Sequence, residues 1–217
     1  TLIIPNCRIN NPEDLKNLEN MKHLSLSKCN TSGISGLKHL PNLETLKISW
    51  FKPNDDQSVL KHLTKLRSLT IRCASTELRN SYSDGADTFY GFEHLRHLKQ
   101  LTIIDAVSKV NLWFMKSMEL KEQFGYLENL EQLTIIDDLA TRNDNERYFS
   151  TEFSLIPNLK QVKFQNCTIY DISRIMWLLM MKSKRNITII FDNCILNDHM
   201  TEFLANDDII IRNGSSR

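Results

Sequence analysis

The phrase Leu98-Lys99-Gln100-Leu101-Thr102-Ile103 is the strongest indicator of the fold, because its pattern recurs along the whole chain. Its template is an apolar residue, two variable residues, a second apolar residue, one variable residue and a third apolar residue. Further copies of this template begin at Met21, Leu43, Leu66, Leu130 and Leu159, and residues 2–4 and 189–191 fit it more loosely. A phrase that recurs at intervals of about 20 to 50 residues is typical of a stacked, repetitive architecture.

Alternation within the phrase predicts a half-buried β-strand. In Leu101-Thr102-Ile103 the two apolar side chains share one face of such a strand, and the threonine takes the other. The second apolar position recurs at residues 2, 24, 46, 69, 101, 133, 162 and 189, and residues 209–211 offer a ninth strand. Because one repeat cannot bury its apolar edge alone, we expect the strands of neighbouring repeats to stack side by side.

The pattern resembles the leucine-rich repeat, whose consensus is L-x-x-L-x-L-x-x-[NC]-x-L. Cysteine or another small residue follows several strands where the consensus has Asn or Cys: Cys7, Cys29, Ala74, Cys167 and Cys194. The resemblance covers nearly the whole chain. It implies an α/β fold, a leucine-rich-repeat solenoid of about eight repeats. Parallel strands would line its concave face, and helical or irregular segments would return behind them.

The spacing of the strands predicts thin repeats at the front and thick repeats at the back. The first three steps are 22, 22 and 23 residues long, which suits a short return. Residues 170–184 are apolar at helical spacing, and a second helical pattern begins at residue 198. The stretch Cys194-Ile195-Leu196-Asn197-Asp198 also resembles the opening of cysteine-containing and ribonuclease-inhibitor-like repeats. We therefore expect helical returns in the last repeats.

Two longer steps, of 32 and 29 residues, contain polar insertions at about residues 75–90 and 137–150. Both follow a strand directly, so we expect them on one rim of the solenoid, where recognition loops often lie. Tolerated insertion without function is the alternative interpretation. Residues 110–124 predict a return helix with a wide apolar face, or else a docking helix. Because the chain opens inside a strand with no polar cap, we expect residues 1–217 to be a single domain within a larger protein.

Composition excludes several classes of protein. The 217 residues are 41% hydrophobic and 24% charged, which excludes a disordered chain. Lys plus Arg number 27 and Asp plus Glu number 26, a formal net charge of +1 that disfavours nucleic acid as the partner. No run of about 18 uncharged apolar residues occurs, so we expect no contact with the interior of a membrane.

The five cysteines predict structural free thiols. Four of them occupy the same repeat position, where a small buried side chain hydrogen-bonds to neighbouring backbone. The fifth, Cys73, stands one place earlier, at the edge of the concave face. The chain has no C-x-x-C pair, so no zinc site is recognisable. Free thiols favour a reducing, intracellular setting, either cytoplasmic or nuclear.

The motifs of known catalytic sites are absent from the sequence. It has no phosphate-binding loop, no Gly-x-Ser-x-Gly and no carboxylate pair in a recognisable context. His94 and His97 have the spacing of a helical metal pair, yet no third ligand accompanies them. We therefore expect no catalytic residue, no cofactor and no metal site.

The variable positions in and just after the strands form the candidate partner-binding surface. Exposed aromatic and isoleucine side chains on a polar sheet fit the footprint of a protein partner. Basic residues gather towards the front and aspartates towards the middle, a division that would orient the partner. In the alternative interpretation, the insertions fold over the strands and bury these apolar groups. The candidate partner-binding residues are Lys47, Trp50, Phe51, Thr70, Arg72, Thr102, Ile104, Asp105, Thr134, Ile136, Asp137, Lys163 and Gln165.

The leading hypothesis is a non-enzymatic module that binds another protein on its concave face and insertion rim, as the recognition part of a larger receptor. The cysteine-containing repeats resemble those of F-box substrate receptors of ubiquitin ligases. The phrase at residues 40–46 resembles the sensor domain of nucleotide-binding immune receptors. Other domains of the same chain would accompany either arrangement. An RNA-binding adaptor is a further alternative, which needs a basic face with stacking aromatics. The last alternative is a regulatory scaffold for a separate catalytic domain.

Overall fold

The structure is a computed structural model that describes residues 1–5, 12–27, 31–49, 57–72, 91–104, 124–137, 155–169, 175–196, 198–205, 209–212 and 215–216. The predicted insertions at 75–90 and 137–150, apart from Asp137, lie outside the described residues. The same holds for the helix predicted at 110–124, except its last residue, and for Cys7, Cys29 and Cys73.

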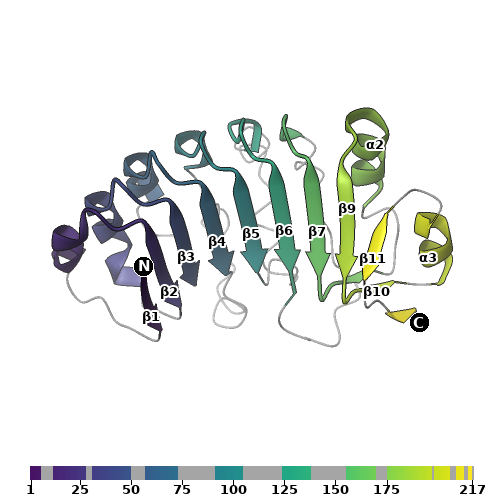
Figure 1. Cartoon of the computed structure of the whole chain (residues 1–217), viewed down its shortest axis with the longest axis horizontal. Helices are drawn as coiled ribbons and strands as arrows, with labels where there is room; N and C mark the ends of the chain where they lie inside the picture. Colours follow the sequence, from purple (N-terminus) through teal and green to yellow (C-terminus); the bar gives the residue numbers. More distant parts are fainter. Residues whose placement is uncertain are drawn as a thin grey trace, which may run out of the picture.

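One parallel sheet runs the length of the molecule, and its strands follow one another in chain order (Figure 1). Each strand pairs with the next in the order β1-β2-β3-β4-β5-β6-β7-β9-β11. The bounds are β1 (Leu2–Pro5), β2 (His23–Ser27), β3 (Thr45–Ser49), β4 (Ser68–Arg72), β5 (Gln100–Ile104), β6 (Gln132–Ile136), β7 (Gln161–Gln165), β9 (Thr188–Asp192) and β11 (Ile210–Arg212). The predicted parallel stacking is confirmed, and so is the ninth strand.

The pairing register matches the sequence template at every step. Leu69 of β4 lies beside Leu101 of β5, which lies beside Leu133 of β6. In β4 and β7 half-buried and buried side chains alternate, as the phrase predicts. Equivalent apolar side chains are therefore stacked from repeat to repeat on one face of the sheet, and they form a continuous core.

Leucines spaced three residues apart explain the short returns of the front repeats. Leu37, Leu40 and Leu43 are fully buried, and the amide of each later leucine donates to the carbonyl of the one before, at 3.0 and 3.1 Å. A 3₁₀-helix has three residues per turn, so this spacing keeps all three side chains on one face. The front returns are the 3₁₀-helices η1 (Pro12–Leu18), η2 (Thr31–His39), η3 (Gln57–His62) and η5 (Phe92–His94).

The returns of the last repeats are α-helices, which confirms the predicted change from thin to thick repeats. Helix α2 spans Met176–Arg185 and α3 spans Asp198–Ala205. On β7 and β9, the buried rings of Phe164 and Phe191 stack with centroids 5.3 Å apart. Over the described part of the chain, no helix has the length and apolar character needed to cross a membrane.

A second, three-stranded parallel sheet lies just beyond the ends of the last strands. It consists of β8 (Thr168–Ile169), β10 (Ile195–Leu196) and β12 (Ser215–Ser216), in the order β12-β10-β8. The chain turns into β8 and β10 through Asn166 and Asn193, whose φ angles are 57° and 52°. Asparagine adopts this left-handed conformation more readily than most residues. The Asn193 side-chain amide also donates to Asn166 Oδ1 at 2.9 Å, so the two turns brace each other.

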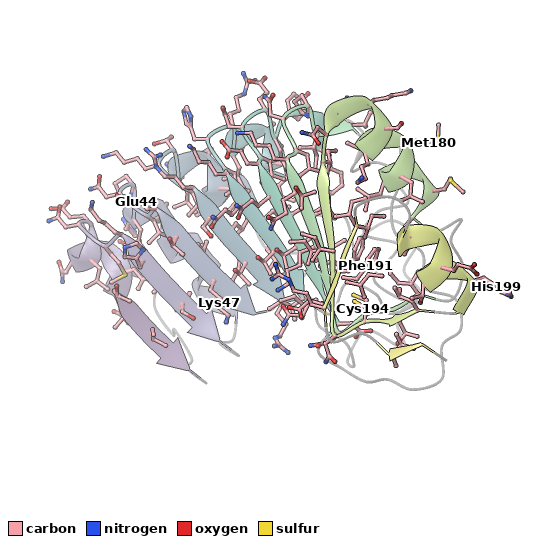
Figure 2. The ribbon with its side chains drawn as sticks, turned by 45° about the vertical axis from the view of Figure 1, so that its right-hand side comes forward. Glu44, Lys47, Met180, Phe191, Cys194 and His199 are labelled. Atoms are coloured by element: carbon pink, nitrogen blue, oxygen red, sulfur yellow. The ribbon has the colours of Figure 1, made fainter. Side chains whose placement is uncertain are left out.

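The two described cysteines are free, buried thiols (Figure 2 labels Cys194). The Cys167 thiol donates to the carbonyl of Ile135 in the preceding repeat at 3.7 Å. The Cys194 thiol likewise donates to the carbonyl of Phe164 in the preceding repeat, at 3.5 Å. The predicted structural role is therefore confirmed for these two cysteines. A hydrogen bond with Cys167 lowers the pKa of the Cys194 thiol, and burial acts against this shift.

Candidate interaction surface

The side of the main sheet that points away from the core and the returns is called here the open face; the sequence predicts it as the concave face. Its central row contains one residue from each of five neighbouring strands: Lys47, Thr70, Thr102, Thr134 and Lys163. Neighbouring strands lie about 4.8 Å apart, so this row extends over about 19 Å. The fold therefore places five of the predicted partner-binding residues in a line.

The central row is polar and accessible to solvent. Lys47 is exposed, and Thr70, Thr102 and Thr134 are half-buried with their side chains on the open face (Figure 2 labels Lys47). A threonine hydroxyl both donates and accepts hydrogen bonds. Three adjacent threonines thus offer a ladder of short hydrogen-bonding groups to a molecule that lies on the sheet.

A row of glutamines borders the central row on the side where the strands begin. Gln100, Gln132 and Gln161 are in register on β5, β6 and β7. The amide of Gln100 donates to Gln132 Oε1 at 3.2 Å across the strands. This border is uncharged, so it adds hydrogen-bonding capacity without selecting the charge of a partner.

The opposite border contains Arg72, Ile104, Ile136 and Gln165, which are in register at the ends of their strands. Arg72, Ile136 and Gln165 are half-buried. Ile104 is only 6% exposed, so the predicted exposure of its side chain is wrong. Ile104 has the open-face register and lies outside the main core cluster, and Arg72 and Ile136 flank it on both sides.

Asp137 also differs from the prediction, because its side chain is buried rather than exposed at 8% accessibility. It stands where the chain leaves β6, and its amide donates to the Gln165 carbonyl at 3.0 Å. Asn166 occupies the same place after β7, with its amide donating to Asp192. Asp137 is therefore part of the turn that ends the strand and presents no open negative charge.

The charge at the back of the open face is neutralised within the protein. Lys163 Nζ lies 2.6 Å from Asp192 Oδ2 on the neighbouring strand β9. The prediction missed this pair, because the two residues are far apart in sequence and only strand pairing brings them together. At the front, Lys47 forms no ion pair with any described residue. The open face is consequently basic at its front end.

Three predicted site residues, Trp50, Phe51 and Asp105, lie outside the described residues. Among those that the structure does describe, no group of three or more His, Cys, Asp or Glu side chains could hold a metal ion. The Nε2 atom of His94 lies 3.5 Å from Glu93 Oε1, next to it in the chain.

The strands pair in chain order with equivalent apolar residues stacked, and the described helical returns lie between successive strands. The fold is a leucine-rich-repeat solenoid. No protein-family model matches the sequence, and no curated protein does.

Two solved structures are similar to this solenoid. Internalin C2 from Listeria monocytogenes is 19% identical over 80% of this chain, with a TM-score of 0.44. TLR13, solved in a complex with ssRNA13, is 17% identical over 94% of this chain, with a TM-score of 0.47. The solenoid spans 66% of the internalin C2 chain and 31% of the TLR13 chain.

Proposed function

We propose that this solenoid is a non-enzymatic interaction module and that its open face binds another protein. The in-register row from Lys47 to Lys163 carries the proposal, because it is a continuous polar surface that neither the core nor the returns require. Alternation in the strands leaves these positions free to vary while the buried positions maintain the fold.

The composition of the open face supports a protein partner. Its hydroxyl and amide groups can pair with backbone and side-chain groups of a polypeptide. At the back, Lys163 is paired with Asp192, whereas Lys47 at the front forms no ion pair with a described residue. This difference in charge would favour one orientation of the partner.

The proposed setting is the recognition part of a larger, intracellular receptor. Cys167 and Cys194 are free and buried, which agrees with a reducing compartment. An F-box substrate receptor and a nucleotide-binding immune receptor remain the two specific settings in which such a module would act.

The test is affinity capture with the wild-type chain and with the double variant Thr102→Arg/Thr134→Arg, analysed by mass spectrometry. The two arginines would fill the middle of the open face without touching the core. We expect the variant to lose a discrete set of proteins that the wild type retains. Circular dichroism and thermal unfolding establish that the variant is folded.

The control is Asn17→Arg/Ser183→Arg, which adds the same charge on exposed returns. We expect this control to capture the wild-type set. If the open-face variant also captures that set, the open face is not the binding surface. If the captured set disappears on treatment with ribonuclease, the direct partner is RNA and the proposal of a protein partner fails.

A further inference from the structure

A cluster of positive charge lies on the edge of the sheet where β4 and β5 begin, outside the open face. The segments 57–67 and 91–99 lead into these two strands and contain five Lys or Arg residues but a single glutamate, Glu93. The whole chain has a net charge of only +1. We call these five residues the basic rim: Lys61, Lys65, Arg67, Arg96 and Lys99.

Backbone hydrogen bonds hold the two segments side by side. The amides of Lys99 and Gln100 both donate to the Arg67 carbonyl, at 2.8 and 3.0 Å. Arg67 and Lys99 therefore occupy equivalent positions on adjacent repeats, about 5 Å apart. The Asn129 side chain donates to the Arg96 carbonyl at 2.7 Å, which links the rim to the next repeat.

On either side of the basic rim, a lysine and a glutamate of neighbouring repeats form an ion pair. Lys22 Nζ lies 2.9 Å from Glu44 Oε1, and the hydrogen bond lowers the pKa of Glu44 (Figure 2 labels Glu44 on this edge). Lys160 Nζ lies 3.4 Å from Glu131 Oε2. Between these two pairs, Arg67 and Lys99 are neighbours of like charge. Like charges that face each other on adjacent strands destabilise a sheet. Glu44 and Glu131 flank the two cations, and Arg67 contributes to the lowered pKa of Glu44.

Much of the positive charge of the rim is available to a partner. All five of its side chains belong to exposed residues. Lys61, Arg67 and Arg96 make no ion pair with any residue that the structure describes. Lys65 donates to the neutral Asn42 Oδ1 at 2.7 Å, which leaves its charge uncompensated. Lys99 lies 3.9 Å from Glu131, a carboxylate that it shares with Lys160.

We propose that the basic rim is a second docking site, which binds an acidic segment of a partner protein. Charge complementarity selects carboxylate-rich chains, and arginine pairs with carboxylates in two parallel hydrogen bonds. The rim is short along the sheet edge, because Glu44 borders it on one side and Glu131 on the other.

The surroundings of the rim favour a polypeptide over a nucleic acid. Single-stranded nucleic acids need exposed aromatic side chains on which bases stack. Phe92, the aromatic residue of the two described rim segments, is fully buried.

The test is a fluorescence-anisotropy titration of a fluorescein-labelled octaglutamate peptide with the full chain at low salt. We expect saturable binding that weakens as salt is raised. The variant Arg67→Glu/Arg96→Glu should bind the peptide at least about tenfold more weakly. Its circular dichroism spectrum should match the wild type, since both side chains are exposed.

The matched control is Lys16→Glu/Lys184→Glu, which makes the same change in net charge at exposed sites away from the rim. We expect it to bind the peptide within about twofold of the wild type. Equal losses in both variants would show a nonspecific charge effect and overturn the proposal. Absence of binding by the wild type would overturn it as well, and so would tighter rim-dependent binding of an oligouridine RNA. None of these outcomes depends on the open face, which is unchanged in every variant.

Discussion

At the scale of single residues, Cys167 and Cys194 show why a small, weakly polar side chain suits the position after a strand. Each thiol is buried at 0 to 1% exposure and reaches a backbone carbonyl of the preceding repeat. A larger side chain would press against the neighbouring repeat, and an aliphatic one would supply no donor. The cysteines therefore join adjacent repeats by contacts that repeat with the same geometry.

We predict that Cys194→Ala lowers the free energy of unfolding by about 1–3 kcal/mol, because it removes a buried donor and leaves a small cavity. Cys194→Ser should cost less, since its hydroxyl keeps a donor near the Phe164 carbonyl. Urea denaturation followed by circular dichroism measures both. A serine variant less stable than the alanine variant would show that the hydrogen bond has no net value.

At the scale of elements, strands β7 and β9 are each followed by a residue with a left-handed backbone. These residues are Asn166 after β7 and Asn193 after β9, and after each of them the chain enters the second sheet. The side-chain hydrogen bond between the two asparagines connects equivalent turns of neighbouring repeats. The left-handed backbone and the side-chain hydrogen bond thus both stabilise the turn at this position.

The two contributions of Asn193 can be separated by substitution. We predict that Asn193→Ala lowers stability by about 1–2 kcal/mol, since a Cβ without a compensating polar group strains this conformation. Asn193→Gly should cost less, because glycine adopts a positive φ without strain and only the side-chain hydrogen bond is lost. Thermal and urea unfolding measure the difference. Equal losses in both variants would mean that strain is unimportant at this turn.

At the scale of the whole molecule, stability is built from contacts between neighbours. Each strand pairs only with the strands of the adjacent repeats, and the core is one continuous cluster along the solenoid. Proteins of this kind behave as nearly one-dimensional arrays, in which a defect weakens the nearest repeats first. The position of a buried leucine along the array therefore matters as much as its burial.

We predict that Leu101→Ala in the central strand β5 costs about 2–5 kcal/mol and raises hydrogen exchange most in β4, β5 and β6. Leu24→Ala in β2 is the matched control, because both leucines occupy the same template position and are 1 to 2% exposed. Its effect should be confined to β1, β2 and β3. Hydrogen–deuterium exchange with mass spectrometry resolves the two patterns. Uniform changes over all nine strands in both variants would contradict the array behaviour.

Much of the candidate site could be read from the repeat. The register of Lys47, Thr70, Thr102, Thr134 and Lys163 follows from their common place in the template, and pairing confirms it. Side-chain burial at the strand ends could not be read in this way. The exposure of a side chain at a strand end depends on its neighbours in the folded protein, and the template does not predict the orientation of these side chains.

The repeat pattern is sufficient to predict the parallel strands, their order and the buried positions, because a period-two alternation repeated along the chain can bury its apolar residues only by stacking. Folding was needed to reveal the burial of Ile104 and Asp137, the ion pair between Lys163 and Asp192, and the adjacent like charges of Arg67 and Lys99. These features arise between residues of different repeats. The interaction energies of these residues depend on distances between side chains on neighbouring strands, and the sequence pattern does not predict those distances.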